Sequence, residues 1–127
     1  MSGSSSRDDR WMIAMVRTGR RLATDVRIAR SLRQRMVGLL GRTALPAGEG
    51  LILPRCHFIH TIGMRMAIDA VFVDAGWRVV ALRPTLSPGR VVLPVRGVWG
   101  VVELGEGEIA RAGVQVGDQL LLTARGS

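Results

Sequence analysis

The sequence predicts a mainly β fold of the α+β class. We expect a compact single-domain sandwich or barrel-like sheet of about seven short strands, with one amphipathic helix packed against it. Short apolar runs rich in valine and isoleucine recur along the chain, and glycine- and proline-rich turn signals separate them roughly every 8–12 residues. Only one segment longer than a single turn has the apolar spacing of a helix. A chain of 127 residues is long enough to bury one core.

The first third of the chain is expected to form two strands followed by the helix. Residues 11–17 and 22–29 have the composition of strands and flank a short turn. Between residues 32 and 40, leucines and a methionine recur at i, i+4, i+7 and i+8, which places them on one face of a helix. Ser31 and Gln34 are spaced as a capping box at the start of this helix.

The rest of the chain is expected to contain strands and one helical turn. The clearest signal is a hairpin, because Ile68–Val73 and Trp77–Arg83 flank a three-residue connection in which Gly76 is available for a positive φ. Alternation along its first strand places Asp69 on the same face as Val71. The other expected elements are a strand at 51–53, a loop at 84–89, strands at 90–95 and 98–104, a helical turn at 106–114 closed by Gly113, and a turn followed by a last strand within 116–123.

The ends of the chain differ in composition from the part between them. Residues 1–9 are rich in serine and charge and are expected to form a disordered tail, and residues 124–127 are expected to form a second tail. Residues 10–123 then form the single domain. No internal repeat and no second domain is indicated.

Charge and hydropathy narrow the class of function. All 18 basic residues are arginines, ten of them lie in residues 1–42, and the formal net charge is +8. The joint absence of lysine, asparagine and tyrosine fits a composition bias of the source genome, but an arginine-rich segment also suits an acidic partner. No basic–aromatic motif is present, so specific nucleic-acid binding is not expected. No apolar run suits a membrane span or a signal peptide, so we expect a cytoplasmic protein.

The stretch from Cys56 to Asp69 holds the only cysteine and both histidines of the chain. On a strand, Cys56 and His60 would stand about 13 Å apart, too far for a nucleophile and its base. The ligand spacings of common zinc sites are absent. We therefore predict no catalytic residue, no metal site and no cofactor in this stretch.

A binding site is what this stretch supports best, because a few polar groups lie among apolar neighbours. The predicted ligand-binding residues are His60, Thr61, Met64, Arg65, Asp69 and Glu103. Two interpretations of Asp69 stay open. Its carboxylate either caps the turn at 63–66, with Arg65 or Thr61 as its partner, or faces a ligand.

Three functions follow from these patterns. The first is a non-enzymatic binding module for a small polar ligand or a protein partner, acting through residues 57–69. The second is a hydrolase-like enzyme with Asp69, His60 and Glu103 as acid and base groups. The third is a basic adaptor that contacts an acidic partner through its arginine-rich first third.

Four segments in order also resemble a known family, domain of unknown function 192, whose members are small bacterial and archaeal proteins. They are "RMVGLLGR" at 35–42, "GEGLILP" at 48–54, "HTIGMRMAIDAVFVD" at 60–74 and "VVELGEGEIARAGVQVGDQLLL" at 101–122. The resemblance implies a compact, mostly β domain with a helix against the sheet. It implies no particular chemistry.

Overall fold

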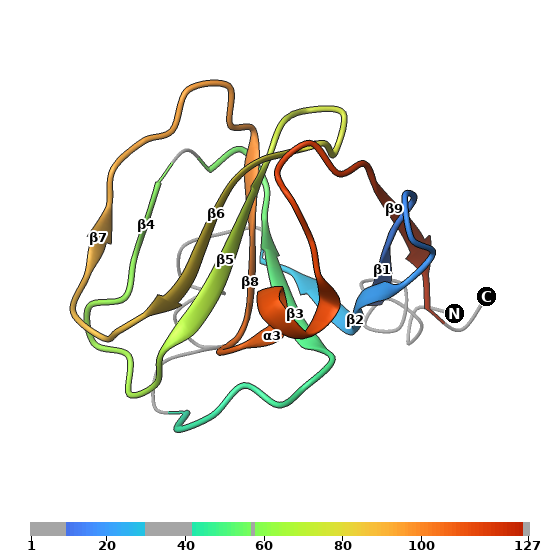
Figure 1. The fold of residues 1–127 in the computed structure, drawn as a ribbon. Coiled ribbons are helices and arrows are strands. Elements are labelled where there is room, and N and C mark those ends of the chain that lie inside the picture. The colour runs from blue at the N-terminus through green and yellow to red at the C-terminus, as the bar shows by residue number, and fades with distance from the viewer. Residues whose placement is uncertain (1–9, 30–41, 57, 126–127) are drawn as a thin grey trace, which may run out of the picture.

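The computed structural model describes residues 10–29, 42–56 and 58–125 (Figure 1). The predicted amphipathic helix, the first nine residues and the end of the second tail lie outside this part of the chain. The elements are β1 (Arg10–Met15), β2 (Arg21–Ile28), β3 (Glu49–Leu53), β4 (Ile59–His60), β5 (Ile68–Val73), β6 (Val79–Leu86), β7 (Val91–Val92), β8 (Gly100–Gly105), α3 (Glu108–Ala112) and β9 (Leu120–Ala124).

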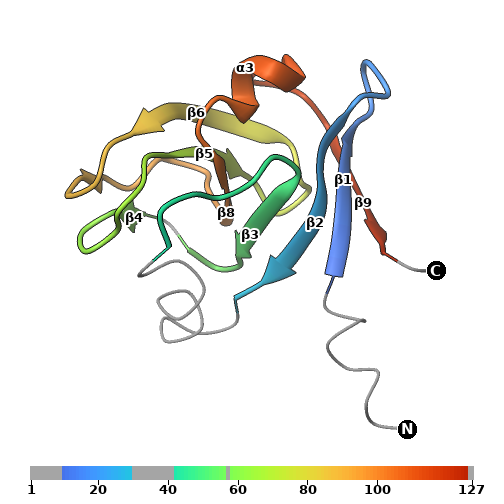
Figure 2. The ribbon, with the colours of Figure 1, turned by 90° about the horizontal axis from the view of Figure 1, so that it is seen from below.

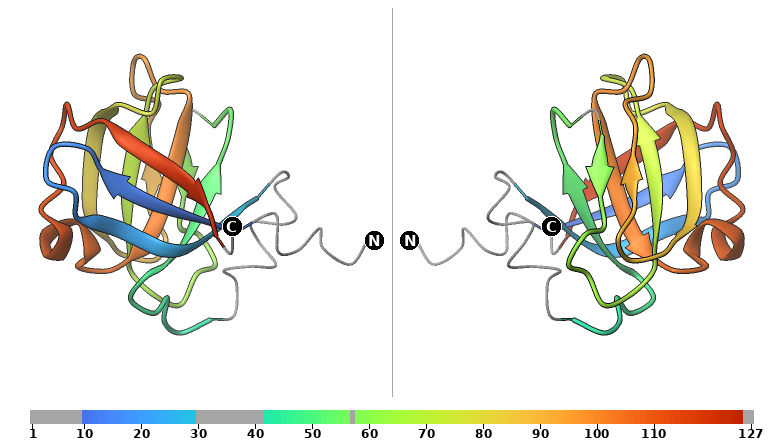
Figure 3. Two further views of the ribbon diagram at one scale, coloured as in Figure 1. Left: turned by 90° about the vertical axis from the view of Figure 1, so that its right-hand side faces the viewer. Right: turned by 90° about the vertical axis from the view of Figure 1, so that its left-hand side faces the viewer.

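Seven strands form one curled sheet, in the order β6-β5-β8-β3-β2-β1-β9. Seen end-on, the sheet wraps into a half-barrel (Figure 2). Its two edge strands approach each other at one end, where Val79 N–H donates to the Asp118 carbonyl and Leu120 N–H donates to the Trp77 carbonyl. The predicted mainly β, barrel-like class is therefore confirmed. Figure 3 shows the two sides of this curled sheet.

Each face of the sheet covers its own apolar cluster. The inner face includes Val71, Val73 and Val102, and α3 packs on it through Ile109 and Ala112. The opposite side is called the outer face below. It carries the strand residues that alternate with those of the inner face. Its cluster is Ala29, Leu51, Leu53, Ile59, Met64, Met66, Ile68, Ala70, Phe72, Ala81, Val92, Val98 and Val101. All six residues of β5 are buried because both of its faces are covered.

A two-stranded ribbon, β4 paired with β7, covers part of the outer face. In Figure 1 it lies beside β6 and β5. Ile59 and Val92 are paired across the ribbon and buried, so they anchor it to the outer cluster. Met64 and Met66 fill the same cluster, as unbranched side chains do at irregular core positions.

The predicted hairpin is formed by β5 and β6, with one local difference in its connection. Asp74 Oδ1 accepts the N–H groups of Gly76 and Arg78, each at 2.9 Å. The positive φ falls on Trp77 (65°) rather than on Gly76. Trp77 stacks edge-on against Trp99, with ring centroids 5.9 Å apart, and this contact holds the indole in place.

Two strand boundaries differ from the sequence prediction. β6 continues through Pro84 to Leu86, where a loop was expected. Proline is tolerated because β6 is an edge strand and needs no ladder donor on its free side. The strand expected at 90–95 is shortened to Val91–Val92, just before the Pro94 that interrupts the ladder.

The helical turn predicted after β8 is present as α3. It ends at Gly113, which has φ 73° and donates its N–H to the Ile109 carbonyl at 3.0 Å, as a left-handed C-terminal residue does. Among the described residues, no helix combines the length and apolar content that a membrane crossing needs.

Candidate functional site

Asp69 is fully buried in β5, on the inner face of the sheet. Its Oδ1 accepts the N–H of Thr85 and its Oδ2 accepts the N–H of Ile109, both at 2.9 Å. Thr85 has a left-handed φ of 52° at an irregularity in the pairing of β5 with β6. Ile109 lies in the first turn of α3, where a backbone N–H has no partner within the helix. The carboxylate therefore joins β5, β6 and α3.

The carboxylate does not bond to the turn at 63–66, where a structural role was expected for it. Its partners, Thr85 and Ile109, lie 16 and 40 residues after Asp69 in the sequence. The bonds that the carboxylate makes are those of a structural group.

Glu103 lies on the opposite side of the sheet from Asp69. In the pairing of β5 with β8, Asp69 is opposite Leu104 and Ala70 is opposite Glu103. Paired residues share a face and neighbours along a strand alternate, so Asp69 points to the inner face and Glu103 to the outer face. The backbone layer separates the two carboxyl groups, and they cannot act on one substrate.

Thr61 is also buried, and its hydroxyl is used by the fold. Thr61 Oγ1 donates to the Ser87 carbonyl at 2.6 Å and accepts the Arg90 N–H at 2.8 Å. These bonds tie the turn after β4 to the loop before β7. The hydroxyl therefore positions the ribbon.

The other three predicted residues lie in different environments. His60 is partly exposed on β4 opposite Val91. Met64 is buried in the outer cluster, while Arg65 is exposed. The six predicted residues therefore do not line one concavity, and the acid–base set of Asp69, His60 and Glu103 is not assembled.

The ribbon carries a different feature, an exposed apolar surface. Its members are large apolar side chains with exposed fractions of at least one half: Phe58 (51%), Ile62 (56%), Val91 (56%) and Leu93 (74%). Phe58 and Leu93 flank the buried pair Ile59 and Val92, and alternation along the two strands turns them outward. We call these four side chains the ribbon surface.

The segments that form the ribbon also carry arginines. Residues 54–67 and 87–98, which form the ribbon and its turns, contain no aspartate or glutamate. Their four arginines are all exposed: Arg55, Arg65, Arg90 and Arg96. No ion pair within the described ranges involves any of them. The predicted segment 57–69 contains Arg65, Phe58 and Ile62, although only Arg65 was among the predicted ligand-binding residues. Val91 and Leu93 lie outside that segment, because single exposed apolar residues give no signal until a fold gathers them.

Two other kinds of site, a metal centre and an ionisable pair with a shifted pKa, can be compared with the ribbon. In the part of the chain that the structure describes, no group of three or more histidine, cysteine or carboxylate side chains is placed to hold a metal ion. The hydrogen bond that Arg17 donates to Asp118, at 2.6 Å, lowers the pKa of that carboxyl against the opposing effect of burial. This pair joins the β1–β2 turn to the loop before β9 and lies away from the ribbon.

The fold and surface define a small, mostly β domain that carries an exposed basic and apolar ribbon. The chain belongs to the family DUF192, described as "Uncharacterized ACR, COG1430", whose model matches residues 14–122. It is 31% identical to a UPF0127 protein of Pyrococcus furiosus over 112 residues, which cover 83% of this chain and 92% of that protein.

Two crystal structures share the fold. One is from Sinorhizobium meliloti 1021 and is described as a candidate transcription regulator; its TM-score is 0.72 at 23% identity, covering 88% of this chain and 91% of that one. The other, of unknown function, is from Novosphingobium aromaticivorans; its TM-score is 0.73 at 24% identity, covering 88% and 83%. Both confirm the architecture.

Proposed function

We propose that this protein is a non-enzymatic binding module that docks an acidic protein segment on the ribbon surface. Two of its four side chains, Phe58 and Ile62, lie within residues 57–69, and Val91 and Leu93 come from β7 and the residue after it. The observation that carries the proposal is that the ribbon segments, 54–67 and 87–98, hold four exposed apolar side chains and four exposed arginines but no aspartate or glutamate.

The apolar part supplies binding free energy. Covering a large apolar side chain that is half exposed removes part of its surface from water, at roughly 25 cal/mol per Å². Contiguous exposed apolar side chains with a polar rim are typical of interaction sites on soluble proteins. Phe58 and Leu93 are the best candidates for anchors because they combine size with exposure.

The charged rim selects the partner. Four arginines with no ion pair among the described residues favour a partner that carries Asp or Glu beside its apolar residues. A second copy of this chain is a poor match, because each copy has a net charge of +8. A membrane surface also fits less well. Membrane interfaces select Trp and Tyr, and the chain has no tyrosine and no tryptophan on this surface.

The proposal moves the basic contact away from the first third of the chain. Several arginines there already have partners: Arg10 pairs with Asp25, and Arg17 pairs with Asp118. The rim arginines of the ribbon have no such ion pairs among the residues described. They are the group best placed to meet an acidic partner.

Peptide display on the full-length protein tests this function. A random peptide library would be selected, and enriched peptides would be titrated by fluorescence anisotropy against the wild type and a Phe58→Ser, Leu93→Ser double variant. We expect enriched peptides to combine acidic and apolar residues, and their affinity to fall at least about tenfold in the double variant. Their affinity should also fall between 50 and 300 mM salt.

Leu121→Ser is the matched control, since Leu121 is 57% exposed on β9, away from the ribbon. It should leave peptide affinity unchanged, and far-UV circular dichroism should show all variants folded. Equal peptide affinity in the wild type and the double variant would refute the proposal. Loss of binding to phosphatidylserine vesicles in the double variant, with no peptide enriched, would instead assign the surface to membranes.

A further inference from the structure

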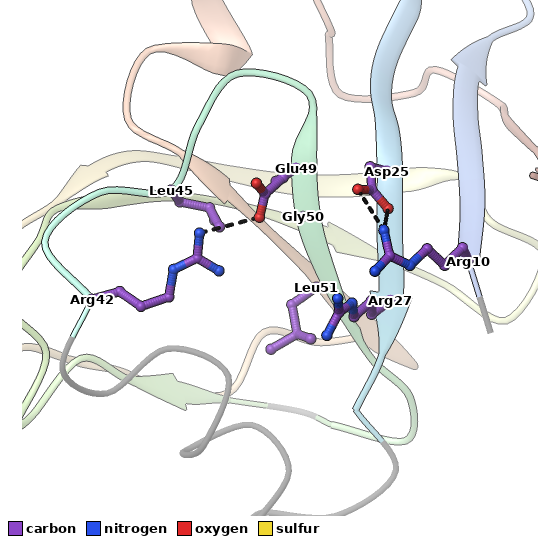
Figure 4. A pocket seen from close by; sticks show the side chains of 8 residues that line it. All are labelled: Arg10, Asp25, Arg27, Arg42, Leu45, Glu49, Gly50 and Leu51. Carbon is purple, nitrogen blue, oxygen red and sulfur yellow. Dashed lines mark hydrogen bonds and ion pairs between the residues drawn. The ribbon is translucent and has the colours of Figure 1, made fainter. Parts of the chain in front are cut away.

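A polar cavity lies on the outer face of the other half of the sheet, away from the ribbon. It has a volume of about 290 Å³, near the lower end of small-molecule sites. Its described lining comes from β1, β2, β3 and the loop before β3: Arg10, Asp25, Arg27, Arg42, Leu45, Glu49, Gly50 and Leu51 (Figure 4).

Strand pairing explains why these side chains meet. Arg10 on β1 is opposite Arg27 on β2, and Arg27 is beside Leu51 on β3. The same register places Asp25 beside Glu49. Paired residues share a face, so all five side chains project from the outer face into one region.

Two of the three arginines in the cavity pair with a carboxylate, and among the described residues the third does not. Arg10 donates to both oxygens of Asp25, at 2.8 and 2.9 Å, and Arg125 also approaches Asp25 at 3.0 Å. Arg42 pairs with Glu49 at 3.2 Å. Arg27 is exposed, and the described residues place no carboxylate within ion-pair distance of it. It lies opposite another cation, Arg10, which is unfavourable on neighbouring strands.

We infer that this cavity binds a small molecule through a carboxylate or phosphate group, with Arg27 as the main contact. The planar guanidinium fork matches the paired oxygens of either group. An anion between Arg27 and Arg10 also relieves the repulsion between the two cations.

Arg42 provides a second contact at little cost. Its pair with Glu49 is open to solvent, with the two side chains 39% and 37% exposed. Exposed pairs of this kind contribute little to stability, so Arg42 can turn toward a bound anion. Leu45 and Leu51 give the cavity an apolar wall for the rest of the ligand.

Titration with inorganic phosphate and with succinate, in separate arms at constant ionic strength, tests the inference. Binding would be followed through the Nε–H signals of the arginines in two-dimensional NMR of the full chain. We expect saturable shifts at Arg27 and Arg42 in at least one arm. Arg27→Gln should weaken this binding by about tenfold or more, because a charge-assisted contact is lost. The titrant that saturates the shifts at the lower concentration shows whether the site prefers a phosphate or a carboxylate group.

Arg83→Gln is the matched control. Arg83 is exposed on β6, and its side chain donates only to the carbonyl of its neighbour Leu82 among the described groups. This variant should bind both anions like the wild type, and Arg27→Gln should keep the melting temperature and the peptide binding of the ribbon. Two results would overturn the inference: no saturation in either arm, or equal weakening in both variants.

Discussion

Replacing Asp69 by alanine would leave two backbone N–H groups without their acceptor. The Ile109 N–H lies in a fully buried bond, whereas the Thr85 N–H is only partly buried and can regain water. A buried donor without a partner costs about 1–3 kcal/mol. Taking the upper part of this range for Ile109 and the lower part for Thr85, we expect the free energy of unfolding to fall by about 3 kcal/mol. The Asp69→Asn variant keeps one acceptor oxygen, so its free energy of unfolding should lie between those of Asp69→Ala and the wild type.

Urea denaturation followed by tryptophan fluorescence would measure this loss by linear extrapolation. Asp74→Ala is the matched control, because Asp74 also accepts two backbone N–H groups, but in a solvent-exposed turn. Water can replace the lost acceptor there, so the cost should be about 1 kcal/mol or less. The reasoning fails if Asp69→Ala costs no more than Asp74→Ala. A ligand-facing Asp69 would show that result together with loss of ligand binding.

Two further changes probe other contacts. Because Asp118 has a folded-state pKa below the ordinary value of 3.8, the stabilisation from Arg17 is present above that pH and is lost as pH falls through the folded-state value. Arg17→Gln should therefore lower the urea midpoint more at pH 7 than at pH 2.5, and equal lowering at both would contradict this. Gly105→Ala should cost about 1–3 kcal/mol in the same denaturation assay, since its Cβ would overlap the Leu45 carbonyl oxygen. Gly76→Ala, whose Cβ would meet only Asp74 Oδ1 at 3.5 Å, should cost less; equal costs would count against the overlap.

Local patterns predicted much of the fold. Alternation along residues 68–73 correctly assigned Asp69 and Val71 to one face, because side chains on a strand alternate whatever the strand pairs with. Gly113 was correctly expected to end a helical turn, since a left-handed residue there suits glycine. The boundaries of β6 and β7 were less predictable, because tolerance of proline depends on whether a strand lies at an edge.

The residues of the two proposed sites were harder to predict because they depend on contacts between distant segments. Phe58 precedes β4 and Leu93 follows β7, so these two distant residues form one surface only when β4 pairs with β7. The cavity likewise requires Arg10 and Arg27 to be opposite each other on neighbouring strands. The spacing of residues within one segment cannot predict such contacts between segments.

The sequence alone determined which side chains share a face within each strand and how the charge is distributed along the chain. Only the tertiary structure decided which strands are neighbours and in what register. The register of β5 with β8 sets Asp69 opposite Leu104 and leaves Glu103 on the other face. A shift of one residue would have placed the two carboxyl groups on the same side of the sheet. Alternation is a property of one strand, whereas register follows from the packing of both faces at once.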